Sequence, residues 1–157
     1  MISQIGHRSD RERFAATLRR FDGEKRWGLG LFPLPTTMSY DEMLAAGKEL
    51  TEYLQAGGSA ERLTVEIRKP GGAAWGCQWV RYVVGHADNS TLVLNAEIPM
   101  PRGALYVAAA EVFDAEESAD LFLAYHQTGE LPEGYVLRPA EGYNPDGNSI
   151  ELPSAAK

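Results

Sequence analysis

Apolar residues recur at helical spacing in three parts of the chain, which predicts α-helices over residues 9–21, 39–55 and 114–129. In the first of these, Phe14 and Leu18 share one stripe, and the opposite face is basic. Each predicted helix starts with a capping residue and has a glutamate three positions later: Ser9 with Glu12, Ser39 with Glu42, and Asp114 with Glu117. Glycines mark the expected helix ends: Gly23, Gly57 and Gly129.

An apolar run over residues 26–35 indicates a first strand, and from about residue 61 apolar and polar residues alternate, which indicates further strands. The strands are expected at residues 26–35, 62–69, 75–85, 91–98, 104–113 and 134–139. Pro33 and Pro35 close the first of these, which places it at a sheet edge because proline cannot donate to a ladder. The order of elements predicts an α+β fold, an antiparallel meander of about five to six strands with three helices mainly on one face.

The length of 157 residues fits one domain, expected over residues 1–152, with residues 153–157 as a flexible tail. No apolar run approaches the roughly 20 residues that span a bilayer. The first residues contain no apolar core of signal-peptide length. The only cysteine, Cys77, has no partner for an internal disulfide and is expected to be a buried thiol. These features together predict a cytoplasmic protein.

Charge is distributed unevenly along the chain, whose net formal charge is −7. Residues 1–26 hold seven Lys/Arg against four Asp/Glu, whereas residues 103–157 hold two against ten. An acidic last third argues against nucleic-acid binding, which depends on neutralising phosphates. It suits a basic protein partner through complementary fields, and it equally suits a solvated acidic surface.

No group of residues has the spacing of a catalytic or metal-binding motif. His7, His86 and His126 fall in three separate predicted elements, and structural or surface roles are expected for them. Gly28 and Gly30 lack the third glycine and the following helix of a phosphate-binding loop. The sequence therefore predicts no metal, no cofactor and no catalytic residue. Glu66 is expected to be solvated, opposite Arg81 on the next strand.

Aromatic residues gather on the predicted strands: Trp27, Phe32, Trp75, Trp79, Tyr82 and Tyr106. Interleaved with Arg68, Arg81 and Asp88, they have the composition of a protein-binding surface. Two other interpretations remain open, because the same aromatics can complete the core or line a ligand pocket.

Residues 104–143 contain a strand, an Asp-capped helix and a TG-x-x-P turn that leads into a short strand. Together with the preceding VEIRKPGGAAWGCQWVRYVV meander, this stretch resembles small immunity proteins that accompany secreted polymorphic toxins in actinobacteria. The rich use of Ala, Arg and Gly suits such a source. The resemblance implies a non-enzymatic protein that occludes the active site of a toxin, so no catalytic residues are transferred from it.

The leading hypothesis is therefore an immunity protein or antitoxin that binds a cognate toxin with a basic catalytic cleft and binds neither nucleic acid nor membrane. The residues expected to contact the partner are Trp75, Trp79, Tyr82, Arg81, Asp88, Glu130, Glu133, Glu141 and Asp146. One alternative is a small-molecule-binding or enzymatic domain, with His86, Asp88, Arg81 and Tyr82 in an aromatic cavity lined by Trp75 and Trp79. A second alternative is a secretion chaperone or adaptor that recognises a helical partner.

Overall fold

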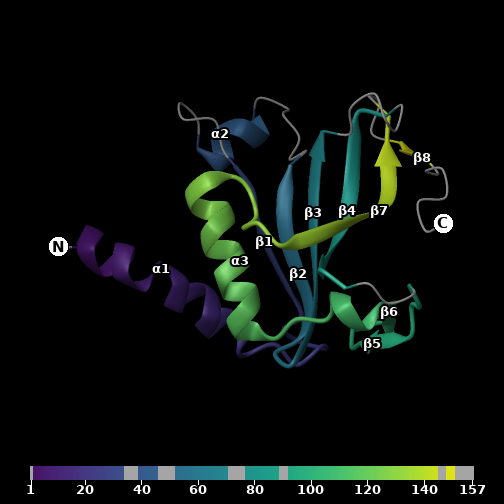
Figure 1. Cartoon of the computed structure of the whole chain (residues 1–157). Helices are drawn as coiled ribbons and strands as arrows, with labels where there is room; N and C mark the ends of the chain where they lie inside the picture. Colours follow the sequence, from purple (N-terminus) through teal and green to yellow (C-terminus); the bar gives the residue numbers. More distant parts are fainter. Residues whose placement is uncertain are drawn as a thin grey trace.

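The structure is a computed structural model that describes residues 2–33, 39–45, 52–70, 77–88, 92–144 and 148–150. It confirms an α+β fold, with a layer of helices against an antiparallel sheet (Figure 1). The helices are α1 (Ile2–Leu18), α2 (Tyr40–Ala45), α3 (Ala115–Thr128) and the 3-10 helix η1 (Ala109–Glu111). The strands are β1 (Gly28–Leu31), β2 (Tyr53–Ser59), β3 (Arg62–Pro70), β4 (Trp79–His86), β5 (Ala96–Ile98), β6 (Leu105–Val107), β7 (Tyr135–Tyr143) and β8 (Ser149–Ile150).

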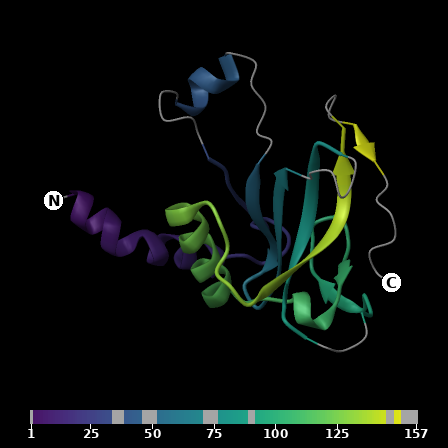
Figure 2. The same cartoon turned by 45° about the horizontal axis from the view of Figure 1, so that its top comes forward.

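The main sheet has six strands in the order β1-β2-β3-β4-β7-β8, and every neighbouring pair is antiparallel. β1 lies at an edge of this sheet, as Pro33 and Pro35 predict. The meander prediction is wrong for residues 91–98 and 104–113. Within them, β5 and β6 pair only with each other and form a separate hairpin beside the main sheet (Figure 2).

The prediction of a helix over residues 39–55 is wrong at its C-terminal end, because Tyr53 begins strand β2, whereas residues 46–51 lie outside the described residues. Gly57 is not a helix stop: it pairs with Gly28 on β1 and with Thr64 on β3. Pairing on both sides provides a full set of backbone hydrogen bonds, and this long-range gain overrides local helical spacing. α2 has six residues, so among the helices in the described ranges only α1 and α3 are long.

The local capping signals have mixed outcomes. Ser39 and Glu42 form the expected capping box, with each backbone N–H donating to the other side chain at 3.1 Å. Asp114 caps α3 by accepting from the backbone N–H of Glu117, and Gly129 ends α3 with φ of +75°. Ser9, however, lies inside α1, which starts at Ile2 rather than at residue 9.

α3 covers one face of the sheet, and α1 packs against α3, joins the core at its C-terminal end and projects away from the sheet at its N-terminal end (Figure 1). Alternate residues of β2 and β3 point toward them and form the main core with the apolar side of α3: Leu54, Ala56, Leu63, Val65, Ile67, Phe113, Leu121 and Phe122. Arg11 of α1 and Arg19, which directly follows α1, bind the carboxylates of Asp120 and Glu116 on α3, which fixes the helix pair at its exposed rim. None of the described helices combines the length and the apolar composition that crossing a bilayer requires.

Among the described residues, the opposite face of the sheet is covered only in part. Val83 of β4 meets Ile98 and Val107 of the β5–β6 hairpin in a second, smaller core. Glu111 of η1 is buried and binds Arg138 of β7 through two hydrogen bonds of 2.7 and 2.9 Å. The hairpin and η1 thus close one end of this face. We call the remaining part, away from α1 and α3, the open face.

Candidate functional site

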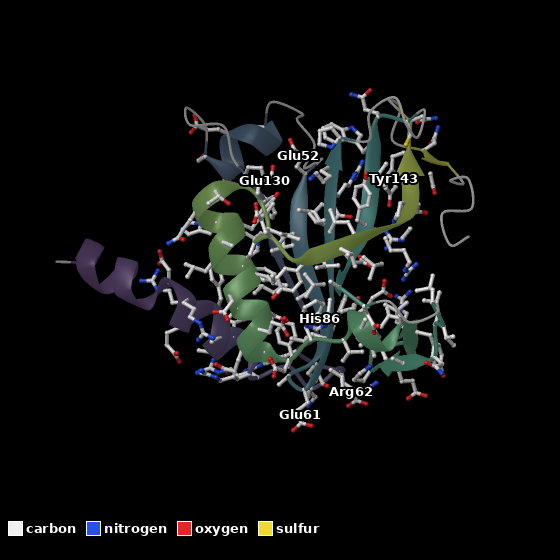
Figure 3. All side chains as sticks on the ribbon, viewed as in Figure 1. Glu52, Glu61, Arg62, His86, Glu130 and Tyr143 are labelled. Atoms are coloured by element: carbon white, nitrogen blue, oxygen red, sulfur yellow. The ribbon has the colours of Figure 1, made fainter. Side chains whose placement is uncertain are left out.

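Strand register brings a polar and aromatic set together on the open face. Tyr53 is paired with Arg68, Arg68 with Arg81, and Arg81 with Glu141, so their side chains follow one line across four strands. Trp79 and Tyr143 are paired at the end of β4 and β7. Figure 3 shows Tyr143 at the opposite end of the sheet from His86, the last residue of β4. The aromatic and charged side chains of the open face therefore gather at the end of the sheet away from the hairpin.

A carboxylate network ties these strands together. Glu66 accepts from Arg81 Nη1 and from Gln55 Nε2, both at 2.7 Å. The pairing of Glu66 with Arg81 is confirmed, but the expectation that Glu66 is solvated is wrong, because only 9% of this residue is exposed. Burial of a carboxylate is costly unless cations and donors compensate it. Arg81 and Gln55 provide that compensation here.

Glu141 extends the network to the other edge of the face. It lies 3.5 Å from Arg81 Nη2 and accepts from the hydroxyls of Tyr143 and Ser149. The hydrogen bonds from Ser149 and Tyr143 lower the pKa of Glu141 below its usual range. Burial, followed by the bond to Glu141, raises the pKa of Tyr143. The neutral phenol and the charged carboxylate therefore stabilise each other.

Arg68 sits between two aromatic rings. Its guanidinium carbon lies 4.1 Å from the ring centre of Tyr143 and 5.9 Å from that of Trp79. Its Nε is buried and has no hydrogen-bond partner among the described residues. We call Arg68, Trp79 and Tyr143 the arginine–aromatic cluster. The two rings hold the guanidinium in one position, so the cluster is arranged before any partner arrives.

The structure brings together three of the residues predicted to contact a partner, namely Trp79, Arg81 and Glu141. Tyr82 points to the other face and packs against the main core. The remaining described members are exposed at two separate places: Asp88 after β4, and Glu130 with Glu133 between α3 and β7. Trp75 and Asp146 lie outside the described residues, as does the expected tail of residues 153–157. Cys77 is half-buried rather than fully buried.

Sequence reasoning missed the contributions of Gln55 and Tyr143. Gln55 was assigned to a helix, and Tyr143 lies beyond the predicted end of the last strand. A signal for Gln55 was present in residues 53–59, where Leu54 and Ala56 alternate with polar or small residues. No local signal marks Tyr143, because its role depends on pairing with Trp79 sixty-four positions earlier.

The polar pocket of the small-molecule alternative does not form as one unit. His86 lies on the helix-covered side, where its Nδ1 donates to the carbonyl of Ala110 and its Nε2 faces the carboxylate of Glu117. His86 also stacks on Phe113 at 4.5 Å between ring centres. Arg81 is on the opposite face with Glu66. The contacts of His86 join the end of β4 to η1 and to the start of α3, which is a structural role.

Tyr135 belongs to the same contact set and gives the fold a dependence on alkaline pH. Its hydroxyl donates to Glu117 Oε2 at 2.8 Å, and burial together with this bond raises the pKa of Tyr135 to about 12. An unfolded chain releases the phenol proton near pH 10, whereas the folded chain keeps it. The stability from this group is complete below pH 10 and is lost as pH rises through 12. Urea unfolding should show a smaller loss over this range in Tyr135→Phe than in wild type, and equal slopes would contradict the assignment.

Within the described ranges, no group of three or more His, Cys, Asp and Glu side chains is arranged to hold a metal ion. The site thus consists of a buried ion pair, a hydrogen-bonded carboxylate and an arginine held between two rings. We compared the chain with protein-family models, with curated proteins and with solved structures, and none of the three comparisons gave a match.

Proposed function

We propose that this chain is a non-enzymatic protein-binding module, an immunity protein that neutralises a cognate toxin by covering its active site. It would act in the cytoplasm of an actinobacterial cell that makes the toxin. The observation that carries the proposal is the arginine–aromatic cluster on the open face, flanked by Arg81 and Glu141. Tryptophan, tyrosine and arginine are the residues that most often dominate the energy of protein interfaces.

The rigid arrangement of the cluster supports the proposal. Ordering a long side chain on binding costs about 0.5–1.5 kcal/mol, and a group that is already held in place avoids this loss. Arg68 is fixed by two rings, and Glu141 by Tyr143, Ser149 and Arg81. The open face can therefore bind a partner without first becoming ordered.

Charge indicates what kind of partner fits. Glu130 pairs with Lys69 near the end of β3, and Glu52 directly precedes β2. Both glutamates lie at the same end of the sheet as Tyr143 (Figure 3). At this end Arg81 is balanced by the carboxylates of Glu66 and Glu141, whereas Arg68 contacts the two rings and keeps its positive charge. With a chain charge of −7, these acidic groups complement a basic cleft, such as that of a toxin acting on nucleic acid or a dinucleotide.

The test starts from the gene beside the one that encodes this chain. We expect it to encode a secreted protein ending in a toxin domain whose expression stops growth, and co-expression of this chain should restore growth. In a binding assay with the purified toxin domain, Trp79→Ala and Tyr143→Ala should each weaken the complex by about 30-fold, the effect of a 2 kcal/mol hot spot.

Tyr106→Ala is the matched control, because Tyr106 is an exposed aromatic residue on β6 in the hairpin, away from the cluster. This variant should bind the toxin domain as wild type does. A neighbouring gene without toxicity, or a toxic one whose effect this chain does not relieve, would contradict the immunity function. Tight binding that is insensitive to both cluster variants would contradict the assignment of the open face.

A further inference from the structure

A hollow of about 710 Å³ lies beside the edge strand β1, separate from the arginine–aromatic cluster. Its floor contains Gly28, Gly30 and Gly57, which register places side by side: Gly28 is paired with Gly57, and Gly30 follows two positions along β1. A Cβ atom on Gly28 or Gly30 would meet nothing within 4 Å. The hollow exists because Gly28 and Gly30 leave open space on the sheet surface, whereas the side chain of Met100 lies over Gly57.

The floor also holds a polar group that lacks a partner. Thr64 is only 4% exposed, lines the hollow, and its Oγ1 has no hydrogen-bond partner in the described part of the chain. A buried hydroxyl without a partner costs about 1–3 kcal/mol, so the position favours a ligand that completes the bond. Gln55 and Glu66 line the hollow next to Thr64.

Three cations line the same hollow: Arg20, Lys25 and Arg26. The described residues provide no ion-pair partner for any of them. Asp22 does not serve as one, because its Oδ1 accepts the backbone N–H groups of Glu24, Lys25 and Arg26 at 2.8–3.1 Å. These bonds lower the pKa of Asp22 and fix the turn that carries Lys25 and Arg26.

Apolar side chains form the rest of the wall. Trp27 is 44% exposed and Leu105 is 38% exposed, and both line the hollow together with Met100 and Phe21. An exposed tryptophan beside these three cations provides a flat surface for a ring and a positive site for the charged substituent of that ring. The volume falls within the range of roughly 300–1,000 Å³ that small-molecule sites occupy.

We propose that this hollow binds a small planar anion, a ring system that carries a carboxylate, sulfonate or phosphate group. The ring lies against Trp27 and Leu105 over the glycine floor. The anionic group faces Lys25 and Arg26, and a polar ring substituent pairs with the hydroxyl of Thr64. This site goes beyond the proposed toxin binding, because Arg68, Trp79 and Tyr143 do not line it.

The test uses 1-anilinonaphthalene-8-sulfonate, a planar anionic fluorophore, as the probe. Titration into the full-length wild-type chain should give saturable binding at one site. Gly30→Leu fills the hollow where there is open space, and Lys25→Glu combined with Arg26→Glu inverts the charge. Each of these two variants should weaken binding at least tenfold while keeping the far-UV circular dichroism and the melting temperature of a folded protein.

Two controls separate this site from the rest of the surface. Lys69→Glu changes a cation on the helix-covered side, and Trp79→Ala changes the arginine–aromatic cluster. Both should bind the probe as wild type does, so failure of this site is distinguishable from failure of the proposed function. The proposal is overturned if wild type shows no saturable binding below millimolar probe, or if Gly30→Leu binds with unchanged affinity.

Discussion

Replacing Gly58 by alanine is expected to destabilise the folded chain by roughly 3–5 kcal/mol, from combined backbone strain and overpacking. Gly58 has a φ of +124°, a conformation that residues with a side chain rarely adopt. An added Cβ would lie 2.4 Å from the carbonyl oxygen of Arg62 and 2.7 Å from Cγ2 of Ile98. Neither atom can easily move away, because one belongs to the backbone of β3 where it pairs with Ser59 and the other to the smaller core beneath the hairpin.

Gly30→Ala is the matched control for this substitution. Gly30 is also a strand glycine, but its φ is not positive and a Cβ there would meet nothing. We expect a change within about 1 kcal/mol, since alanine also reduces the entropy of the unfolded chain. Urea unfolding of both variants measures the contrast. A Gly58→Ala variant as stable as Gly30→Ala would show that the turn and the hairpin do not constrain Gly58.

The parts of the fold that sequence predicts well are those that depend on neighbouring residues. Asp114 and Gly129 begin and end α3 through bonds made close by in the sequence, and both behave as expected. The Glu117 side chain does not complete the capping box, because its carboxylate binds His86 and Tyr135 instead. β2 shows the limit. Leu54 continues the helical spacing of the preceding residues, yet strand pairing with β1 and β3 determines its conformation. Pairing partners far along the chain leave no trace in a short window of sequence.

In the candidate site too, features set by neighbouring residues are predictable from the sequence, and features set by long-range strand pairing are not. Trp79 and Arg81 share a face because strand side chains alternate, and the same rule sends Tyr82 to the other face. Arg81 and Tyr82 therefore cannot belong to one contact surface, because adjacent residues of a strand point to opposite faces. Glu141 meets Arg81 through the register of β4 and β7, which shifts by a bulge between Arg81 and Tyr82. The glycine floor likewise arises only when β1 is placed beside β2.

Substituting Arg81 by methionine is expected to destabilise the chain by about 3 kcal/mol, near the lower end of the cost of breaking a buried ion pair. Methionine keeps the apolar stem but leaves Glu66 without its cation. The side chains of Glu66 and Arg81 are 12% and 24% exposed, so water compensates only part of the lost pairing. Gln55 remains as a neutral donor to Glu66, which limits the loss.

A double-mutant cycle distinguishes the cost of an abandoned charge from a general loss of packing. Glu66→Gln in the Arg81→Met background removes the unpaired carboxylate, so urea unfolding should recover most of the lost stability. If the double variant is as unstable as Arg81→Met alone, packing rather than charge explains the effect. A double variant that recovers stability is a folded chain whose open face lacks the charge pair. Its affinity for the toxin then shows whether Arg81 and Glu66 contribute to recognition or only stabilise the sheet.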